Sequence, residues 1–198
     1  MKFVIGLTGT IASGKSTAGA YLSRKASLYV DADKVGHQVV EEEKEHLASM
    51  FGPSVIKDGH LDRKALGAIV FSDPQELAKL NRYTHPLICS RIADMVDKIP
   101  DGLVVIEAIE LIRTPLKDLV DQIWVVWAEP QVRIKRMVTE RGLTEQEARE
   151  RIKSQWDDET YRKLADVVIV STDGPVEDLY RQIDQALEKE QDERKREK

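Results

Sequence analysis

The chain has 198 residues, of which 41% are hydrophobic and 33% charged, and its formal net charge is −5 at pH 7. This length allows one well-buried core with a modest insertion but not two full-sized domains. The negative charge argues against a nucleic-acid partner, no apolar run is long enough to span a membrane, and the single cysteine fits a reducing, cytoplasmic compartment.

Five short segments rich in β-branched and aromatic residues predict β-strands. They cover residues 3–7, 28–30, 103–106, 122–128 and 167–170. Most of them are apolar throughout, as strands buried on both faces are. Because amphipathic helical stretches separate these segments, we expect an α/β fold, with a five-stranded parallel sheet flanked by helices.

A glycine-containing segment follows the first strand and precedes a helix. It reads Gly9-Thr10-Ile11-Ala12-Ser13-Gly14-Lys15-Ser16 and matches the phosphate-loop pattern G-x-x-x-x-G-K-[ST]. Backbone N–H groups of such a loop point at phosphate oxygens, beside the N-terminus of the following helix. We expect Lys15 to bridge the β- and γ-phosphates, Ser16 to offer its hydroxyl to Mg²⁺, and Thr17 to contact the α-phosphate. The segment predicts a P-loop NTPase fold that binds ATP with Mg²⁺.

Two carboxylates follow the second strand. Asp31 and Asp33 are expected at the carboxyl end of the sheet, where ligands of open α/β folds bind. Phosphoryl transfer benefits from a carboxylate that orients the acceptor hydroxyl and takes its proton, and Asp33 is the first candidate. Alternation along the strand would place Asp31 on the same face, where it could assist through a substrate contact. A helix N-cap is the alternative role for either aspartate.

The interval between the second and third strands is long and predicted to be mostly helical. We expect residues 34–100 to form a helical acceptor subdomain, inserted into a core of residues 1–33, 101–135 and 164–190. Within it, residues 61–66 are expected to open one helix with an acidic first turn, and Ser72-Asp73-Pro74 to start another with proline near its beginning. Thr84-His85-Pro86 is expected to interrupt the second helix and place His85 at a corner, because the residue before proline disfavours the α region.

The segment from 136 to 163 is rich in arginine and predicts a lid. Kinases exclude water by closing such a segment over the triphosphate, where arginines stabilise the developing charge. The candidates are Arg136, Arg141, Arg149 and Arg151, and Arg141 is favoured because Gly142 would let the lid hinge. Support of an exposed helix is the alternative role for each arginine. The charged tail, residues 191–198, is expected to fray into solvent together with residues 189 and 190.

A conformational switch is a second class of function that a phosphate loop leaves open. Residues 33–36 fit the D-x-x-G spelling of a switch GTPase. Such proteins read their base with N-K-x-D after a later strand, but the only asparagine here, Asn81, falls inside a predicted helix. The sequence therefore favours a small-molecule kinase over a nucleotide-binding switch.

In order and spacing, fragments along nearly the whole chain resemble the dephospho-coenzyme A kinase family. They are residues 6–16, 31–33, 51–52, 61–66, 85–86, 151–155 and 165–169. The resemblance implies ATP-dependent phosphorylation of the ribose 3′-hydroxyl of dephospho-CoA, the last step of CoA synthesis. It also implies that Asp33 is the base and that Arg63 and His85 lie in or beside the acceptor pocket. Another small-molecule P-loop kinase is the alternative.

Some positions depart from the usual pattern of that family. Residues 109–111 read Ile-Glu-Leu where the family tends to show Pro-Leu-Leu, and Glu140 aligns with the family's lid arginine. Ser171-Thr172 replaces an asparagine after the fifth strand, and Thr10 and Ala12 replace frequent glycines. These departures concern acceptor, phosphate and adenine contacts.

Overall fold

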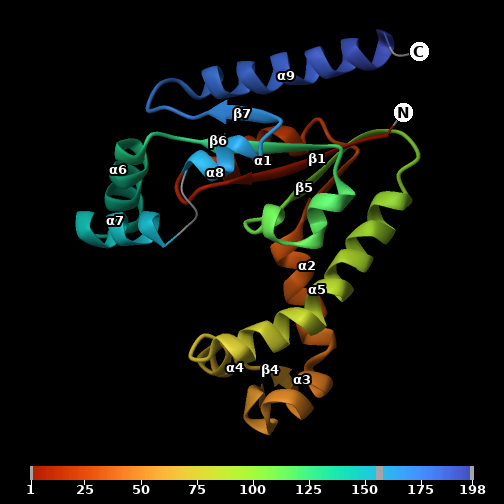
Figure 1. The fold of residues 1–198 in the computed structure, drawn as a ribbon, viewed down its shortest axis with the longest axis vertical. Coiled ribbons are helices and arrows are strands. Elements are labelled where there is room, and N and C mark those ends of the chain that lie inside the picture. The colour runs from red at the N-terminus through yellow and green to blue at the C-terminus, as the bar shows by residue number, and fades with distance from the viewer. Residues whose placement is uncertain (1, 155–157, 197–198) are drawn as a thin grey trace. The chain divides into compact units, whose positions relative to one another are not determined.

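The computed structural model describes residues 2–154 and 158–196, and the chain divides into two compact units. The sheet unit comprises residues 1–29 and 99–198, and the helical unit comprises residues 30–98. Figure 1 shows the order of their elements. Gln155, from one of the fragments quoted above, and residues 197–198 of the tail lie outside the described residues.

The sheet unit is built on parallel strands in the order β2-β5-β1-β6-β7. Their bounds are β1 Lys2–Gly9, β2 Leu28–Asp31, β5 Gly102–Glu107, β6 Gln122–Trp127 and β7 Val167–Val170. The register pairs Leu7 of β1 with Glu107 of β5, so β5 ends beside the start of the phosphate loop. The predicted α/β fold with five strands is confirmed.

The core of the sheet unit lies between the sheet and two of its helices. The helices of this unit are α1 Lys15–Ser23, α6 Pro130–Arg141, α7 Glu145–Lys153, α8 Asp158–Lys163 and α9 Val176–Arg196. Short 3₁₀ turns, η2 Leu111–Arg113 and η3 Pro115–Leu119, connect β5 to β6. Leu22 of α1 and Ile183 of α9 are fully buried against Leu7 and Trp124 of the sheet. Burial of Leu22 holds α1 against the sheet. Helix α1 also contains the last residues of the phosphate loop, so the same packing positions the loop.

The C-terminal residues are helical, so the prediction that they fray is wrong for residues 189–196. The Arg194 guanidinium lies over the Phe3 ring, 4.2 Å from its centroid, and its Nε lies 2.5 Å from Glu190 Oε1. Glu190 is itself buried and accepts a hydrogen bond from Gln122 Nε2. Residues 189–196 contain no apolar side chain, but Glu190 and Arg194 have partners on the sheet. The sequence of the tail alone does not reveal these partners.

The helical unit has a hydrophobic core of its own. Its elements are α2 Ala32–Glu42, α3 Lys44–Phe51, η1 Pro53–Val55, β3 Ile56–Lys57, β4 His60–Leu61, α4 Arg63–Val70 and α5 Pro74–Asp97. The core gathers Leu47, Val55, Leu61, Leu66 and Val70. Asp62 and Asp73 cap α4 and α5 by accepting backbone N–H bonds, so both predicted helix starts are confirmed. The small β3–β4 hairpin was not predicted.

Helix α5 is assigned without a break from Pro74 to Asp97, so the predicted interruption at Thr84-His85-Pro86 is wrong, although the helix bends partway along its length (Figure 1). Proline removes one backbone hydrogen bond and disfavours the helical region for the residue before it. In α5, buried Thr84 and buried Ile92 hold the turns on either side of the proline. The Thr84 hydroxyl also donates to the Leu80 carbonyl at 3.0 Å. Tertiary packing thus overrides the local preference of Pro86.

Candidate functional site

A cavity of about 620 Å³ in the sheet unit is lined by the whole predicted phosphate loop, residues 9–17. Residues from the end of α6 and from the segment 170–179 complete its wall. All nine predicted nucleotide-binding residues therefore face the same space. This volume suits a small-molecule ligand.

Gly14 sets the backbone geometry where the loop enters α1. Its φ of 94° is left-handed, and it is the N-cap of α1 with no side-chain capping bond. A methyl group added at Gly14 would lie only 2.8 Å from Ser171 Oγ, so a side chain has neither the backbone conformation nor the space. Because no side chain caps α1, its first N–H groups can donate to an anion in the cavity.

Two hydroxyls of the loop are buried without a partner in the described part of the chain. They are Thr10 Oγ1 and Ser13 Oγ. Buried polar groups nearly always have a hydrogen-bond partner, so these two hydroxyls are exceptions. Both residues belong to the loop that lines the cavity.

Lys15 contacts Glu107, a residue that the sequence analysis did not single out. Lys15 Nζ donates to Glu107 Oε1, and the Tyr29 hydroxyl donates to Glu107 Oε2. Glu107 ends β5 beside the central strand, and a carboxylate at a strand end was the signal that could have revealed it. With the exposed hydroxyl of Ser16, Glu107 supplies the hard oxygen donors that Mg²⁺ prefers, so the site fits this ion.

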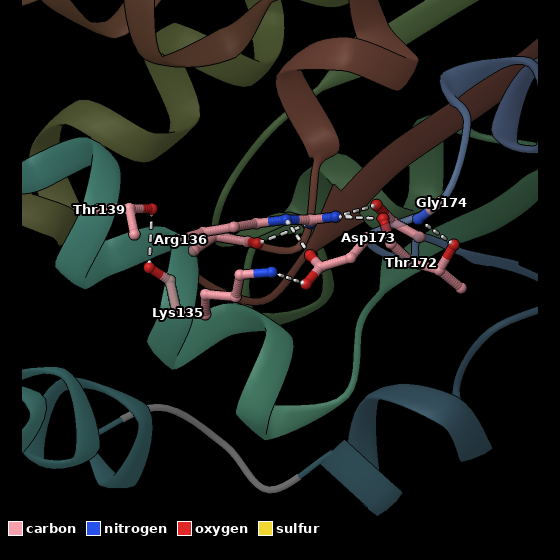
Figure 2. Close-up of polar contacts among 8 residues, drawn as sticks. Lys135, Arg136, Thr139, Thr172, Asp173 and Gly174 are labelled. Atoms are coloured by element: carbon pink, nitrogen blue, oxygen red, sulfur yellow. Dashed lines mark hydrogen bonds and ion pairs between the residues drawn. The ribbon is translucent and has the colours of Figure 1, made fainter.

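Arg136 connects the phosphate loop to the segment after β7 (Figure 2). Its Nη1 donates to the Ala12 carbonyl at 3.1 Å, and its Nη2 donates to Ser171 Oγ at 3.1 Å and to the Thr172 carbonyl at 2.6 Å. Ala12 is one of the few non-glycine residues with positive φ, 57°. Arg136 thus holds a costly turn of the loop in place.

The segment 171–174 is further fixed by ion pairs and a turn. Lys135 Nζ lies 2.7 Å from Asp173 Oδ2, and this hydrogen bond lowers the pKa of Asp173 below its ordinary value. The backbone N–H of Gly174 donates to Thr172 Oγ1 at 3.1 Å. Figure 2 shows these contacts gathered beside Arg136. Ser171 and Thr172, which stand where the family often has asparagine, therefore serve as partners of Arg136.

The four candidate lid arginines have different surroundings. Arg136 and Arg141 line the cavity, together with Glu140. Arg149 and Arg151 lie on α7 outside that lining, and Arg149 Nη2 pairs with Glu145 Oε1 at 2.5 Å. The alternative of an exposed helix supported by ion pairs thus describes Arg149.

Gly142, the expected hinge, adopts φ of 66° and caps the end of α6. Beyond it, α6 and α7 share a small buried cluster of Ile134, Met137 and Ala148, against which Ile11 and Ala12 of the loop also pack. The two helices therefore pack as a pair against the loop. Hinging at Gly142 stays a prediction.

Exposed apolar side chains line the cavity on two sides. Ile109 follows β5 and is 47% exposed, whereas Val170 and Val176, at the end of β7 and after it, are 37% and 40% exposed. Two strands, β1 and β6, separate β5 from β7, so Ile109 lies on the other side of the phosphate loop. Val170, Pro175 and Val176 provide the apolar surface that suits the flat ring of a nucleotide base.

In the helical unit, the two predicted carboxylates have separate roles. Asp31 is the N-cap of α2, and its Oδ1 accepts a hydrogen bond from the Lys34 backbone N–H at 3.1 Å. Asp33 lies in the first turn of α2 with its side chain exposed. The expectation that strand alternation aligns the two residues is wrong, because α2 already begins at Ala32. The capping role therefore falls to Asp31.

Arg63 lies close to the helix that carries Asp33. Its Nη2 donates to the carbonyl oxygen of His37 on α2 at 3.5 Å. Asp33 and His37 are four residues apart and therefore share one face of α2. The fold thus brings Arg63 to the side of α2 on which Asp33 lies.

His85 lies on the part of α5 that meets α2. A methyl group added at Gly36 of α2 would lie 3.3 Å from Ile88 Cδ1 of α5. The Tyr83 hydroxyl of α5 donates to Glu43 Oε2, just past the end of α2, so the two helices run antiparallel. His85 therefore lies farther along α2 than Gly36, whereas Asp33 lies before it.

The described residues, 2–154 and 158–196, contain neither a cluster of metal-ligating side chains nor a membrane-spanning helix. No group of three His, Cys, Asp or Glu side chains there could hold a metal ion. No helix within these ranges is long and apolar enough to cross a membrane. A cation at the phosphate loop would therefore depend on the ligand's phosphates together with the few protein oxygens.

Comparison with known proteins gives consistent matches over nearly the full length. A family model described as dephospho-CoA kinase matches residues 3–177. A dephospho-CoA kinase from Shouchella clausii is 40% identical over 192 residues, 93% of this chain and 97% of that protein. A Thermus thermophilus protein of solved structure is 31% identical with a TM-score of 0.82, covering 95% of this chain and 97% of its own. A dephospho-CoA kinase structure from Campylobacter jejuni is 27% identical with a TM-score of 0.65, covering 94% and 97%.

Proposed function

Because this chain belongs to the dephospho-CoA kinase family, we propose that it transfers the γ-phosphoryl group of ATP to the ribose 3′-hydroxyl of dephospho-CoA, the last step of CoA biosynthesis. One observation of the structure carries the proposal: the complete phosphate loop lines a cavity that is also lined by apolar side chains from the segment after β7. The triphosphate and the base of ATP match these two surfaces.

The phosphate end of ATP binds to the loop and to α1. The first N–H groups of α1 donate to phosphate oxygens, and Lys15 places its ammonium between the β- and γ-phosphates. Ser16 and Glu107 would hold Mg²⁺, which when bound neutralises charge on the phosphate oxygens. Arg141 at the rim supplies a guanidinium to the charge that develops on the transferred group.

The adenine lies against the apolar side chains of Val170, Pro175 and Val176. Arg136 keeps the neighbouring segment in place through Ser171 and Thr172. This arrangement supports ATP binding without the family's asparagine. The same guanidinium holds the Ala12 carbonyl, so base and phosphate subsites share one support.

The acceptor is bound by the helical unit. Asp33 accepts the proton of the 3′-hydroxyl while that oxygen attacks the γ-phosphorus and the bond to the bridging oxygen of ADP breaks. Arg63 can bind a phosphate of dephospho-CoA through paired hydrogen bonds. His85 of α5 is a further candidate for acceptor binding, and Asp31 keeps the first turn of α2 in place through its cap.

The direct test is turnover of ATP by the purified chain with and without dephospho-CoA. We expect one ADP and one CoA per cycle, with the product's 3′-phosphate identified by mass spectrometry. ATP consumption that does not depend on dephospho-CoA would contradict the proposed acceptor. Tight ATP binding with no turnover of any acceptor would indicate a nucleotide-binding switch instead.

A further inference from the structure

We propose that Tyr29 is a positioning residue for phosphoryl transfer, which holds Glu107 in place while Lys15 serves the phosphates. The inference rests on the proposed function, because Lys15 and Glu107 belong to the same site. Tyr29 comes from β2, Glu107 from the end of β5 and Lys15 from the start of α1, so the contact joins three elements.

The carboxylate of Glu107 is shared between two donors. Lys15 Nζ bonds Oε1, and the Tyr29 hydroxyl bonds Oε2. The side chains of Lys15 and Glu107 are only 16% and 15% exposed. At such partly buried positions, hydrogen bonds to a charged group are strong, and leaving that group without a partner is costly.

ATP brings a second anionic partner for the Lys15 ammonium group. Phosphate oxygens and the Glu107 carboxylate are both anionic, so they compete for the same ammonium group. When Lys15 turns to the phosphates, its bond to Glu107 weakens. The Tyr29 hydroxyl then remains the donor that orients Glu107, and groups that orient a ligand side chain in this way strongly affect metal binding and activity.

Gly19 provides the space for this contact. It lies one turn after Lys15 on the same face of α1. A methyl group added at Gly19 would collide with the Tyr29 hydroxyl and lie 2.8 Å from Glu107 Oε2. Glycine in the middle of a helix is destabilising relative to alanine. The close approach of Tyr29 gives a physical reason for glycine at this position.

The first test is Tyr29→Phe, which removes only the hydroxyl. We expect kcat to fall about tenfold and the Mg²⁺ concentration for half-maximal rate to rise about tenfold, because Glu107 loses its orientation. In EDTA, the ATP affinity of the variant measured by calorimetry should stay within about twofold of wild type. The factor by which Mg²⁺ increases the ATP affinity should be about tenfold smaller in the variant than in wild type. This calorimetric readout does not depend on the acceptor.

Tyr21→Phe is the matched control. The Tyr21 hydroxyl donates to Asp184 Oδ2 at 2.7 Å, so the variant also loses a bond from a tyrosine to a carboxylate, but outside the cavity lining. We expect its kcat and its Mg²⁺ dependence to stay within about twofold of wild type. Thermal melting of both variants separates a loss of folding from a loss of positioning.

The second test is a rescue. Gly19→Ala should lower kcat, and adding Tyr29→Phe to Gly19→Ala should recover part of the loss, because the oxygen that collides is gone. Equal Mg²⁺ dependence in Tyr29→Phe and wild type would overturn the inference, as would a double variant no better than Gly19→Ala. If wild type fails to phosphorylate dephospho-CoA, the proposed function fails, while calorimetry still decides the role of Tyr29.

Discussion

In the sheet unit the nine predicted loop residues converge on one cavity, whereas in the helical unit the predicted residues Asp33, Arg63 and His85 lie on three different helices. The nine loop residues are consecutive, and much of their role belongs to the backbone and to the N-terminus of α1. Asp33, Arg63 and His85 are distant in sequence, and side-chain chemistry defines their roles. The difference indicates that nucleotide binding is encoded locally, while acceptor recognition depends on how separate helices pack. Substitutions should therefore separate the two functions.

The largest separation is expected from Asp33→Asn in the helical unit. Loss of the proton acceptor should lower kcat about 10³-fold, because general base catalysis contributes at this order. ATP affinity by calorimetry should stay within about twofold, since the nucleotide cavity contains no residue of the helical unit. Asp31→Asn is the control, because asparagine caps a helix as well as aspartate does. A full rate in Asp33→Asn would remove Asp33 as the base.

Lys15→Ala in the sheet unit should affect both steps. We expect kcat to fall about 10²-fold, because a charged donor to the transferred group is lost, and ATP affinity to fall as well. Steady-state kinetics and calorimetry measure the two effects. Lys25→Ala, which removes a lysine paired with Asp184, is the control. Unchanged ATP binding and turnover in Lys15→Ala would contradict the assignment of the loop.

Arg63→Ala tests whether the helical unit affects acceptor binding without affecting ATP binding. We expect the KM for dephospho-CoA to rise about tenfold, as for one lost charge-assisted hydrogen bond, with the KM for ATP unchanged. Arg91→Ala is the control, because Arg91 is an arginine of the same unit that pairs with Glu42. A rise in the KM for ATP instead would place Arg63 on the nucleotide side.

Arg136→Ala gives the smallest of these effects. We expect the KM for ATP to rise about fivefold, because the supports of Ala12 and Ser171 are lost, with the KM for dephospho-CoA unchanged. Arg149→Ala should leave both constants unchanged, since Arg149 pairs with Glu145 outside the cavity. Equal effects of the two substitutions would show that Arg136 has no special role.

The features predicted correctly have local signals. Continuous apolar segments revealed the strands, and fixed glycine spacing revealed the loop. The Tyr29–Glu107 contact has no such signal, because it depends on the strand order that places β5 beside β2. The helix through Pro86 and the ordered last turns of α9 required packing partners distant in sequence. Arg136 was predicted as a lid residue, but only the structure reveals its bonds to Ala12 and Ser171.

The helical unit is one continuous insertion, residues 30–98, and no residue of the nucleotide cavity lies within it. The insertion has its own hydrophobic core, so changes within it need not disturb the sheet core. Evolution could therefore replace the insertion and keep the nucleotide machinery. In engineering, the same arrangement recommends the part of this insertion after Asp33, residues 34–98, as the segment to exchange or randomise when a different alcohol acceptor is wanted.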